Sequence, residues 1–157
     1  MLRRLALVVA LTLTVSVTLA CSSGGGGTGD GASSDDDRTR VTEADGITVE
    51  ARWLTEAELA DVDVDLEQYS SDTFALLELK LDTHSGDLKE IDLPSAATLR
   101  QGPGSEAAEA WVSESDDAHH RSGVLVFPRP SENGPVELAV SVAGEAVVLL
   151  WETPPGA

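Results

Sequence analysis

The chain is poor in cysteine and in basic residues. It has one cysteine in 157 residues, so an internal disulfide and a zinc site built from several thiolates are both excluded. Lysine and arginine together number 10 against 28 acidic residues, and the formal net charge is −18. Nucleic-acid binding needs clustered basic side chains to contact phosphates. We therefore expect no nucleic-acid partner.

Familiar catalytic motifs are also missing. The sequence has no Gly-x-Ser-x-Gly turn to present a nucleophilic serine and no glycine-rich phosphate loop. Carboxylates are abundant, but in so acidic a chain their abundance does not indicate glycosidase chemistry. We therefore expect a protein that is not an enzyme.

The N-terminal segment has the pattern of an export signal. Arg3 and Arg4 precede an apolar run, Leu5 to Ala20, and a small residue stands before Cys21. A basic start, an apolar centre and a small residue at the cut are typical of a secretory signal peptide. The run is shorter than the roughly 20 apolar residues that cross a bilayer. Residues 1–20 are therefore predicted to be a signal peptide.

The residues around Cys21 resemble the type II signal peptide of bacterial lipoproteins. That family's recognition box reads Leu, a small residue, Gly or Ala, then Cys, and this chain has Thr18, Leu19, Ala20 and Cys21. Ala20 and Cys21 match, whereas Thr18 departs from the usual leucine. The resemblance implies that Cys21 carries acyl chains such as palmitate and anchors the protein on the extracytoplasmic face of the cell membrane. The alternative is an ordinary cleaved signal with a chance cysteine nearby.

Composition then predicts a tether followed by one domain. Residues 21–40 contain four consecutive glycines and three consecutive aspartates, with scarcely an apolar side chain. Such a segment cannot bury enough apolar surface to offset the entropy of ordering, and we expect a disordered tether with a reach of roughly 24 Å. Residues 41–153 have the size of a single domain, and 154–157 form a short tail.

Hydrophobic alternation in that domain has the period of β-strands. Turn signals separate the apolar segments, and Ala143-Gly144-Glu145 is expected to join the last two as a hairpin. About seven strands predict an all-β fold, an immunoglobulin-like antiparallel sandwich of two sheets. Three tryptophans on separate strands are expected in its core, with a sugar-binding platform as the alternative. The expected strands span residues 47–53, 73–81, 97–100, 108–112, 124–127, 136–142 and 146–151.

The segment after the first of these strands has two patterns. Thr55 to Glu58 has the form of a capping box, which predicts a short helical turn through Ala60. In the next residues Asp61, Asp63 and Asp65 alternate with apolar side chains, which predicts an edge strand with a charged outer face. A calcium loop ending at Asp72 is the alternative, although Leu66 occupies the position of the essential glycine.

The three histidines are the residues that predict a metal site. His84 follows one strand, and His119 and His120 precede another. Imidazoles ligate zinc or copper, and Asp82 or Asp87 would add a carboxylate. His119 and His120 can both ligate only in a loop or bulge, because neighbouring residues of a strand point to opposite faces. The leading interpretation, however, is that these side chains fix turns by hydrogen bonding, and the metal site is the alternative.

The same two segments carry a second resemblance. Asp82-Thr83-His84-Ser85 and His119-His120-Arg121-Ser122-Gly123-Val124-Leu125-Val126-Phe127 are similar to elements of a group of exported bacterial domains with no assigned activity. The similarity covers roughly residues 47–151. It implies a shared fold and a shared site without indicating a reaction.

Together these observations predict a membrane-tethered, non-enzymatic interaction lipoprotein. Its expected partner is another envelope or membrane protein, bound by loops at one end of the sandwich or by an exposed sheet edge. The alternative is an envelope lipoprotein that binds copper or zinc through His84, His119, His120 and Asp82.

Overall fold

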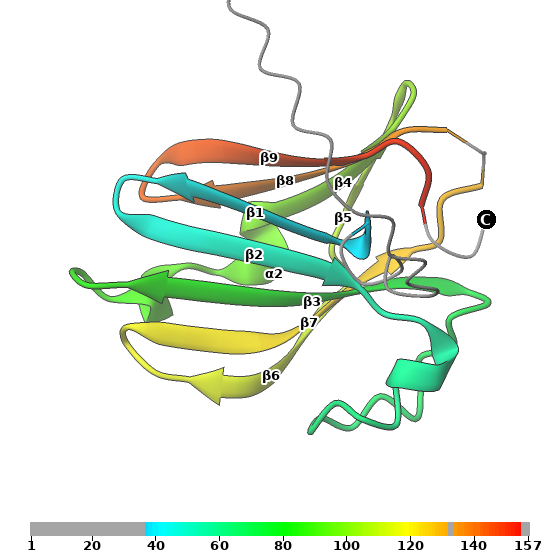
Figure 1. Ribbon diagram of the computed structural model, residues 1–157, viewed down its shortest axis with the longest axis horizontal. Coiled ribbons are helices and arrows are strands. Elements are labelled where there is room, and N and C mark those ends of the chain that lie inside the picture. Colours follow the sequence, from blue (N-terminus) through cyan, green and yellow to red (C-terminus); the bar gives the residue numbers. More distant parts are fainter. Residues whose placement is uncertain (1–36, 132–133, 155–157) are drawn as a thin grey trace, which may run out of the picture. The chain divides into compact units, whose positions relative to one another are not determined.

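The computed structural model describes residues 37–131 and 134–154 (Figure 1). The predicted signal peptide, Cys21 and residues 22–36 of the predicted tether lie outside this part of the chain, as do residues 155–157 of the tail. No helix among residues 37–131 and 134–154 combines the length and the apolarity needed to cross a membrane.

The predicted all-β sandwich of two antiparallel sheets is confirmed, with nine strands in the described residues. The five-stranded sheet has the order β1-β2-β3-β7-β6, and the four-stranded sheet has the order β5-β4-β8-β9. Three short helical segments, η1 (Glu56–Glu58), η2 (Leu88–Glu90) and α2 (Leu93–Ala96), lie in the connections. The strands are β1 (Thr39–Ala44), β2 (Ile47–Trp53), β3 (Phe74–Thr83), β4 (Ala97–Gln101), β5 (Gly104–Ala107), β6 (Ala110–Asp116), β7 (His120–Pro128), β8 (Val136–Val142) and β9 (Glu145–Trp151).

Two strands, β1 and β5, are additional to the seven predicted. β1 begins at Thr39, inside the segment expected to be a tether, and pairs with β2 through a two-residue turn. Asp45 and Gly46 form that turn with φ of 48° and 74°. Positive φ at both positions matches the right-handed twist of paired strands. The predicted hairpin at Ala143 and Gly144 is confirmed and uses the same geometry, with φ of 49° and 83°.

The main core fills the space between the sheets. Alternate residues of β2, β3, β8 and β9 point inward, and most are less than a tenth exposed. Trp53 and Trp151 lie in this core as predicted, with their rings edge to face and 5.9 Å between centroids. Trp111 is partly buried and packs against the core from β6.

A second, smaller core lies on the outer face of the five-stranded sheet. Leu76, Val124 and Val126 project outward there, and the connection from Leu54 to Thr73 folds across them. The predicted edge strand at Asp61–Asp65 is therefore wrong, because these residues form turns and bends in that connection. Their alternating apolar side chains pack against the second core, while the three aspartates face solvent.

The predicted helical turn after Thr55 is confirmed as η1, and Glu58 fastens it. The Glu58 carboxylate accepts hydrogen bonds from the Thr55 amide at 2.8 Å and hydroxyl at 2.6 Å. It also pairs with Arg38 and, at 3.1 Å, with Arg52. Burial alone would raise the pKa of Glu58, but the Thr55 hydrogen bonds and the Arg38 guanidinium outweigh it and lower the pKa to about 2.

We expect Glu58→Gln to destabilise the domain in a pH-dependent way. The folded-state pKa of Glu58 lies below the ordinary value of 4.5, so the ionised carboxylate stabilises the fold above that value. The difference between 4.5 and about 2 corresponds to as much as roughly 3 kcal/mol at pH 6. This contribution is lost as the pH falls towards 2.

Urea unfolding of both proteins at pH 6 and pH 3 tests this prediction. The gap between wild type and variant should fall by about half at pH 3. Glu67→Gln, which removes one charge from an exposed position in the same connection, controls for the change in net charge. A gap that stays constant between the two pH values would contradict the prediction.

Candidate functional site

The turns that carry the three histidines gather at one end of the sandwich, which we call the cleft end. It is formed by the β1–β2 turn, the connection from β3 to β4, the β6–β7 turn and the β8–β9 turn (Figure 1). The register places Ile47 opposite Thr83 and Asp82 opposite His120. The segments Asp82–Ser85 and His119–Phe127 therefore meet in space, although they lie far apart in the sequence.

Asp82 and His120 form a direct contact across β3 and β7. A hydrogen bond of 2.6 Å joins His120 Nδ1 to Asp82 Oδ1, and both side chains are more than half exposed. His119 is bound through its backbone, since its carbonyl accepts from the Thr83 amide and its amide donates to Asp117 Oδ1, both at 2.9 Å. That amide lowers the pKa of the Asp117 carboxyl. His84 is exposed in the following turn.

The described residues contain no group of three or more histidine, cysteine, aspartate or glutamate side chains placed to hold a metal ion. Of the predicted copper or zinc ligands His84, His119, His120 and Asp82, the structure brings only the last two together. The aspartates of the alternative calcium loop, Asp61–Asp72, likewise form no such group. Metal binding by the histidines stays an alternative prediction, and the Asp82–His120 contact corresponds to the leading interpretation, a hydrogen bond that ties two segments together.

Thr83 is a residue of this end that sequence reasoning did not single out. Its side chain is buried, with 4% exposure, and its hydroxyl lies 2.8 Å from the Ser85 carbonyl and 3.2 Å from the Gly46 carbonyl. The hydroxyl thus links the turn after β3 to the β1–β2 turn. The sequence signal for its burial was the period of two, which continues from Leu79 and Leu81 to Thr83 although the surrounding run is polar.

Arg121 is a second such residue. It is buried, with 8% exposure, and its guanidinium donates to the carbonyls of Leu88 at 2.7 Å and Ile91 at 2.8 Å. Its Nε lies 2.9 Å from Asp116 Oδ1, an ion pair without hydrogen-bond geometry. The guanidinium also lies over the Trp111 ring, 5.9 Å from its centroid. Arg121 therefore fixes η2 against β7.

The glycine at position 123, in the segment His119–Phe127, is required by the packing of β6 against β7. A β-carbon at this position would lie 2.4 Å from the Val112 carbonyl oxygen and 2.8 Å from the Trp111 ring. Real β-carbons do not approach other atoms so closely, so β6 can pack beside β7 only across a glycine. Each of five residues in these two segments thus has a contact that gives it a structural role: Asp82, Thr83, His120, Arg121 and Gly123.

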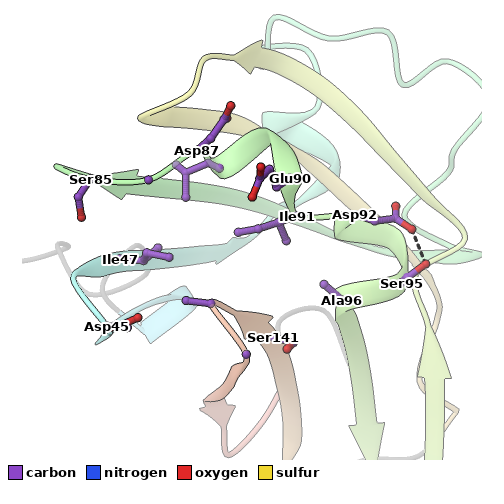
Figure 2. Close-up of a pocket in the computed structure, with 14 residues that line it drawn as sticks. Asp45, Ile47, Ser85, Asp87, Glu90, Ile91, Asp92, Ser95, Ala96 and Ser141 are labelled. Atoms are coloured by element: carbon purple, nitrogen blue, oxygen red, sulfur yellow. Dashed lines mark hydrogen bonds between the residues drawn. The ribbon is translucent and has the colours of Figure 1, made fainter.

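A cleft of about 670 Å³ opens at the same end (Figure 2). The β1–β2 turn, the β3–β4 connection and the β8–β9 turn line it, with Ile47, Ile91 and Ala96 among its apolar residues. Four carboxylates stand around these, and none of the described lining residues is a lysine or arginine. The cleft is therefore concave, partly apolar and negatively charged at its rim. The carboxylates belong to Asp45, Asp87, Glu90 and Asp92.

Two of these carboxylates also order the wall of the cleft. Asp87 caps η2, because its Oδ1 accepts from the Lys89 amide at 2.9 Å. Asp92 Oδ2 accepts from the Ser95 hydroxyl at 2.6 Å, the dashed line in Figure 2. Sequence reasoning missed the cleft because its walls come from three separate turns, and only their folding brings them together.

The fold defines this part of the chain as a two-sheet β-sandwich with a cleft between the turns at one end. No protein-family model matches the sequence, and the comparisons with curated proteins and with solved structures likewise find no match. The functional argument therefore rests on the residues of this chain.

Proposed function

We propose that the protein is a lipid-anchored interaction domain on the extracytoplasmic face of the cell membrane. In this proposal it is not an enzyme, and it binds an envelope or membrane protein through the turns of the cleft end. The observation that carries the proposal is the cleft itself, which three turns build on a rigid sandwich. Turns held by a rigid scaffold are where binding sites commonly occur.

The anchor part of the proposal is supported by sequence and charge. Cys21 follows an apolar leader and a small residue, as the acceptor cysteine of a lipoprotein does. A chain with a net charge of −18 is repelled by anionic headgroups, so direct adsorption would not hold it at a membrane. A covalent lipid on Cys21 provides the attachment that the surface charge opposes.

The experiment combines acyl labelling with site-specific crosslinking in intact cells. Wild type should fractionate with membranes and incorporate a labelled fatty acid, whereas Cys21→Ser should incorporate none and leave the membrane fraction. A photocrosslinker at Ser141, which lines the cleft, should give one discrete adduct with a second protein. The same crosslinker at Glu106, on the exposed strand β5, is the matched control.

Each arm has an outcome that counts against the proposal. A Cys21→Ser protein that stays as firmly membrane-bound as wild type would remove the anchor. Failure to form an adduct from Ser141, or equal adducts from Ser141 and Glu106, would remove the cleft end as the binding surface.

A further inference from the structure

The first described residues of the chain lie at the end of the sandwich opposite the cleft. The Arg38 carbonyl accepts a hydrogen bond of 2.8 Å from the Trp151 indole, and Trp151 is the last residue of β9. The other end of β9 follows the turn of Ala143 and Gly144, which lines the cleft. We call the end that contains Arg38 and Trp151 the exit end, because the chain upstream of Asp37 joins the domain there.

Several contacts hold the first described residues in place at the exit end. The Arg38 guanidinium pairs with Glu58 in η1, which follows the end of β2 farthest from the cleft. Arg40 Nε donates to the Leu150 carbonyl at 2.8 Å, and its guanidinium lies 5.8 Å from the centre of the Trp151 ring. The first residues of the domain therefore contact both sheets and the β2–β3 connection. These contacts fix Arg38 and Arg40 at the exit end.

Strand β1 then runs from the exit end to the cleft end. It spans the six residues Thr39–Ala44, and the next residue, Asp45, lines the cleft. At about 3.3 Å per residue, β1 separates the two ends by roughly 20 Å. Figure 1 shows β1 and β9 running alongside each other between these ends.

We propose that the anchored protein holds its exit end towards the membrane and presents its cleft end outward. This inference rests on the proposed function, because it requires attachment through Cys21. The domain cannot enter the bilayer. A domain attached at one end therefore has the most orientations open to it when its other end points away from the membrane. The four cleft carboxylates reinforce this orientation, because anionic headgroups repel them.

The orientation determines which partner the cleft can meet. A protein that approaches from the envelope space reaches the turns at Asp45, Asp87 and Ala143 directly. A lipid headgroup, or a segment lying on the membrane surface, meets the exit end instead. The cleft end is accordingly the surface for an envelope-side protein partner.

Energy transfer from the full lipidated chain to labelled lipids tests the orientation. Acylation consumes the chain's single cysteine, so an introduced cysteine is the only free thiol. Ser141→Cys places a donor dye at the cleft end and Glu152→Cys places it beside Trp151, and both positions are exposed. Each protein is inserted into phosphatidylcholine vesicles with headgroup-labelled acceptor, with and without phosphatidylglycerol.

The donor at residue 152 should on average lie nearer the bilayer, by at most roughly 20 Å, and transfer more efficiently. The difference should persist in neutral vesicles and increase with phosphatidylglycerol. Equal transfer from the two positions, or stronger transfer from residue 141, in protein that sediments with the vesicles overturns the orientation alone. Lipidated protein that does not sediment with the vesicles overturns the anchor and the orientation together.

Discussion

Replacing Gly123 by alanine is expected to lower the free energy of unfolding by roughly 3 kcal/mol. The added β-carbon would meet the Val112 carbonyl oxygen at 2.4 Å and two atoms of the Trp111 ring at 2.8 and 2.9 Å. The ring could turn aside, but the carbonyl belongs to the backbone of β6, which pairs with β7 at this point. Relief therefore requires β6 to move away from the sheet, with loss of the ladder that holds it.

Urea unfolding monitored by tryptophan fluorescence measures this loss. Ser122→Ala, at the neighbouring position of β7, controls for substitution in the same strand and should change stability by less than about 1 kcal/mol. The double variant Gly123→Ala, Trp111→Leu should recover part of the loss, because it relieves the ring contact and leaves the backbone contact. A Gly123→Ala protein within 0.5 kcal/mol of wild type, on the order of ordinary surface substitutions, would show that β6 shifts freely.

The sandwich could be predicted from the sequence because apolar residues recur with the strand period of two along much of the domain, most regularly in β2. Burial in β2 alternates residue by residue from Ile47 to Trp53, so the hydrophobic pattern and the inward face coincide. β1 is less apolar and is not among the strands predicted: its first two residues fall in the predicted tether and the other four in the predicted domain. Its signal was the pair Asp45-Gly46, which is typical of a two-residue hairpin turn and lies between two alternating segments.

The connection from Leu54 to Thr73 shows where alternation misleads. Val62, Val64 and Leu66 alternate with aspartates as they would in a strand, yet they pack against a face of the sheet without joining it. A period of two indicates which side chains are buried, but it does not indicate which surface they are buried against. The apolar outer face of β3 and β7 supplies that surface, and only the assembled sheet creates it.

The candidate site was predictable only in part, because its contacts join distant segments. The sequence indicated that the segments around Asp82 and His120 contain the candidate site residues. In the structure these two side chains are hydrogen-bonded to each other. The role of Arg121 depends on carbonyls some thirty residues earlier, at Leu88 and Ile91. Backbone carbonyls are common to all residues, so no residue pattern marks these two as its partners.

Arg121→Met is expected to lower the free energy of unfolding by about 3 kcal/mol and to loosen the cleft wall. Methionine fills much of the arginine's volume but cannot donate, so the carbonyls of Leu88 and Ile91 lose a charge-assisted hydrogen bond each. Asp116 loses its ion-pair partner as well. Arg121→Lys should be intermediate, because one ammonium group cannot reproduce the planar guanidinium's contacts with both carbonyls and Asp116.

Hydrogen exchange separates this local effect from general destabilisation. The Leu88 amide donates to Ala118 and the Ile91 amide donates to Leu88, so both report on the segment that Arg121 holds. In Arg121→Met these amides should exchange faster under native conditions, while amides of β2 and β3 change only as far as global stability falls. Equal acceleration throughout the sandwich would show that Arg121 stabilises the core generally. Residues 87–92 form one wall of the cleft. Selective loosening of this segment would therefore show that Arg121 holds the cleft wall against β7.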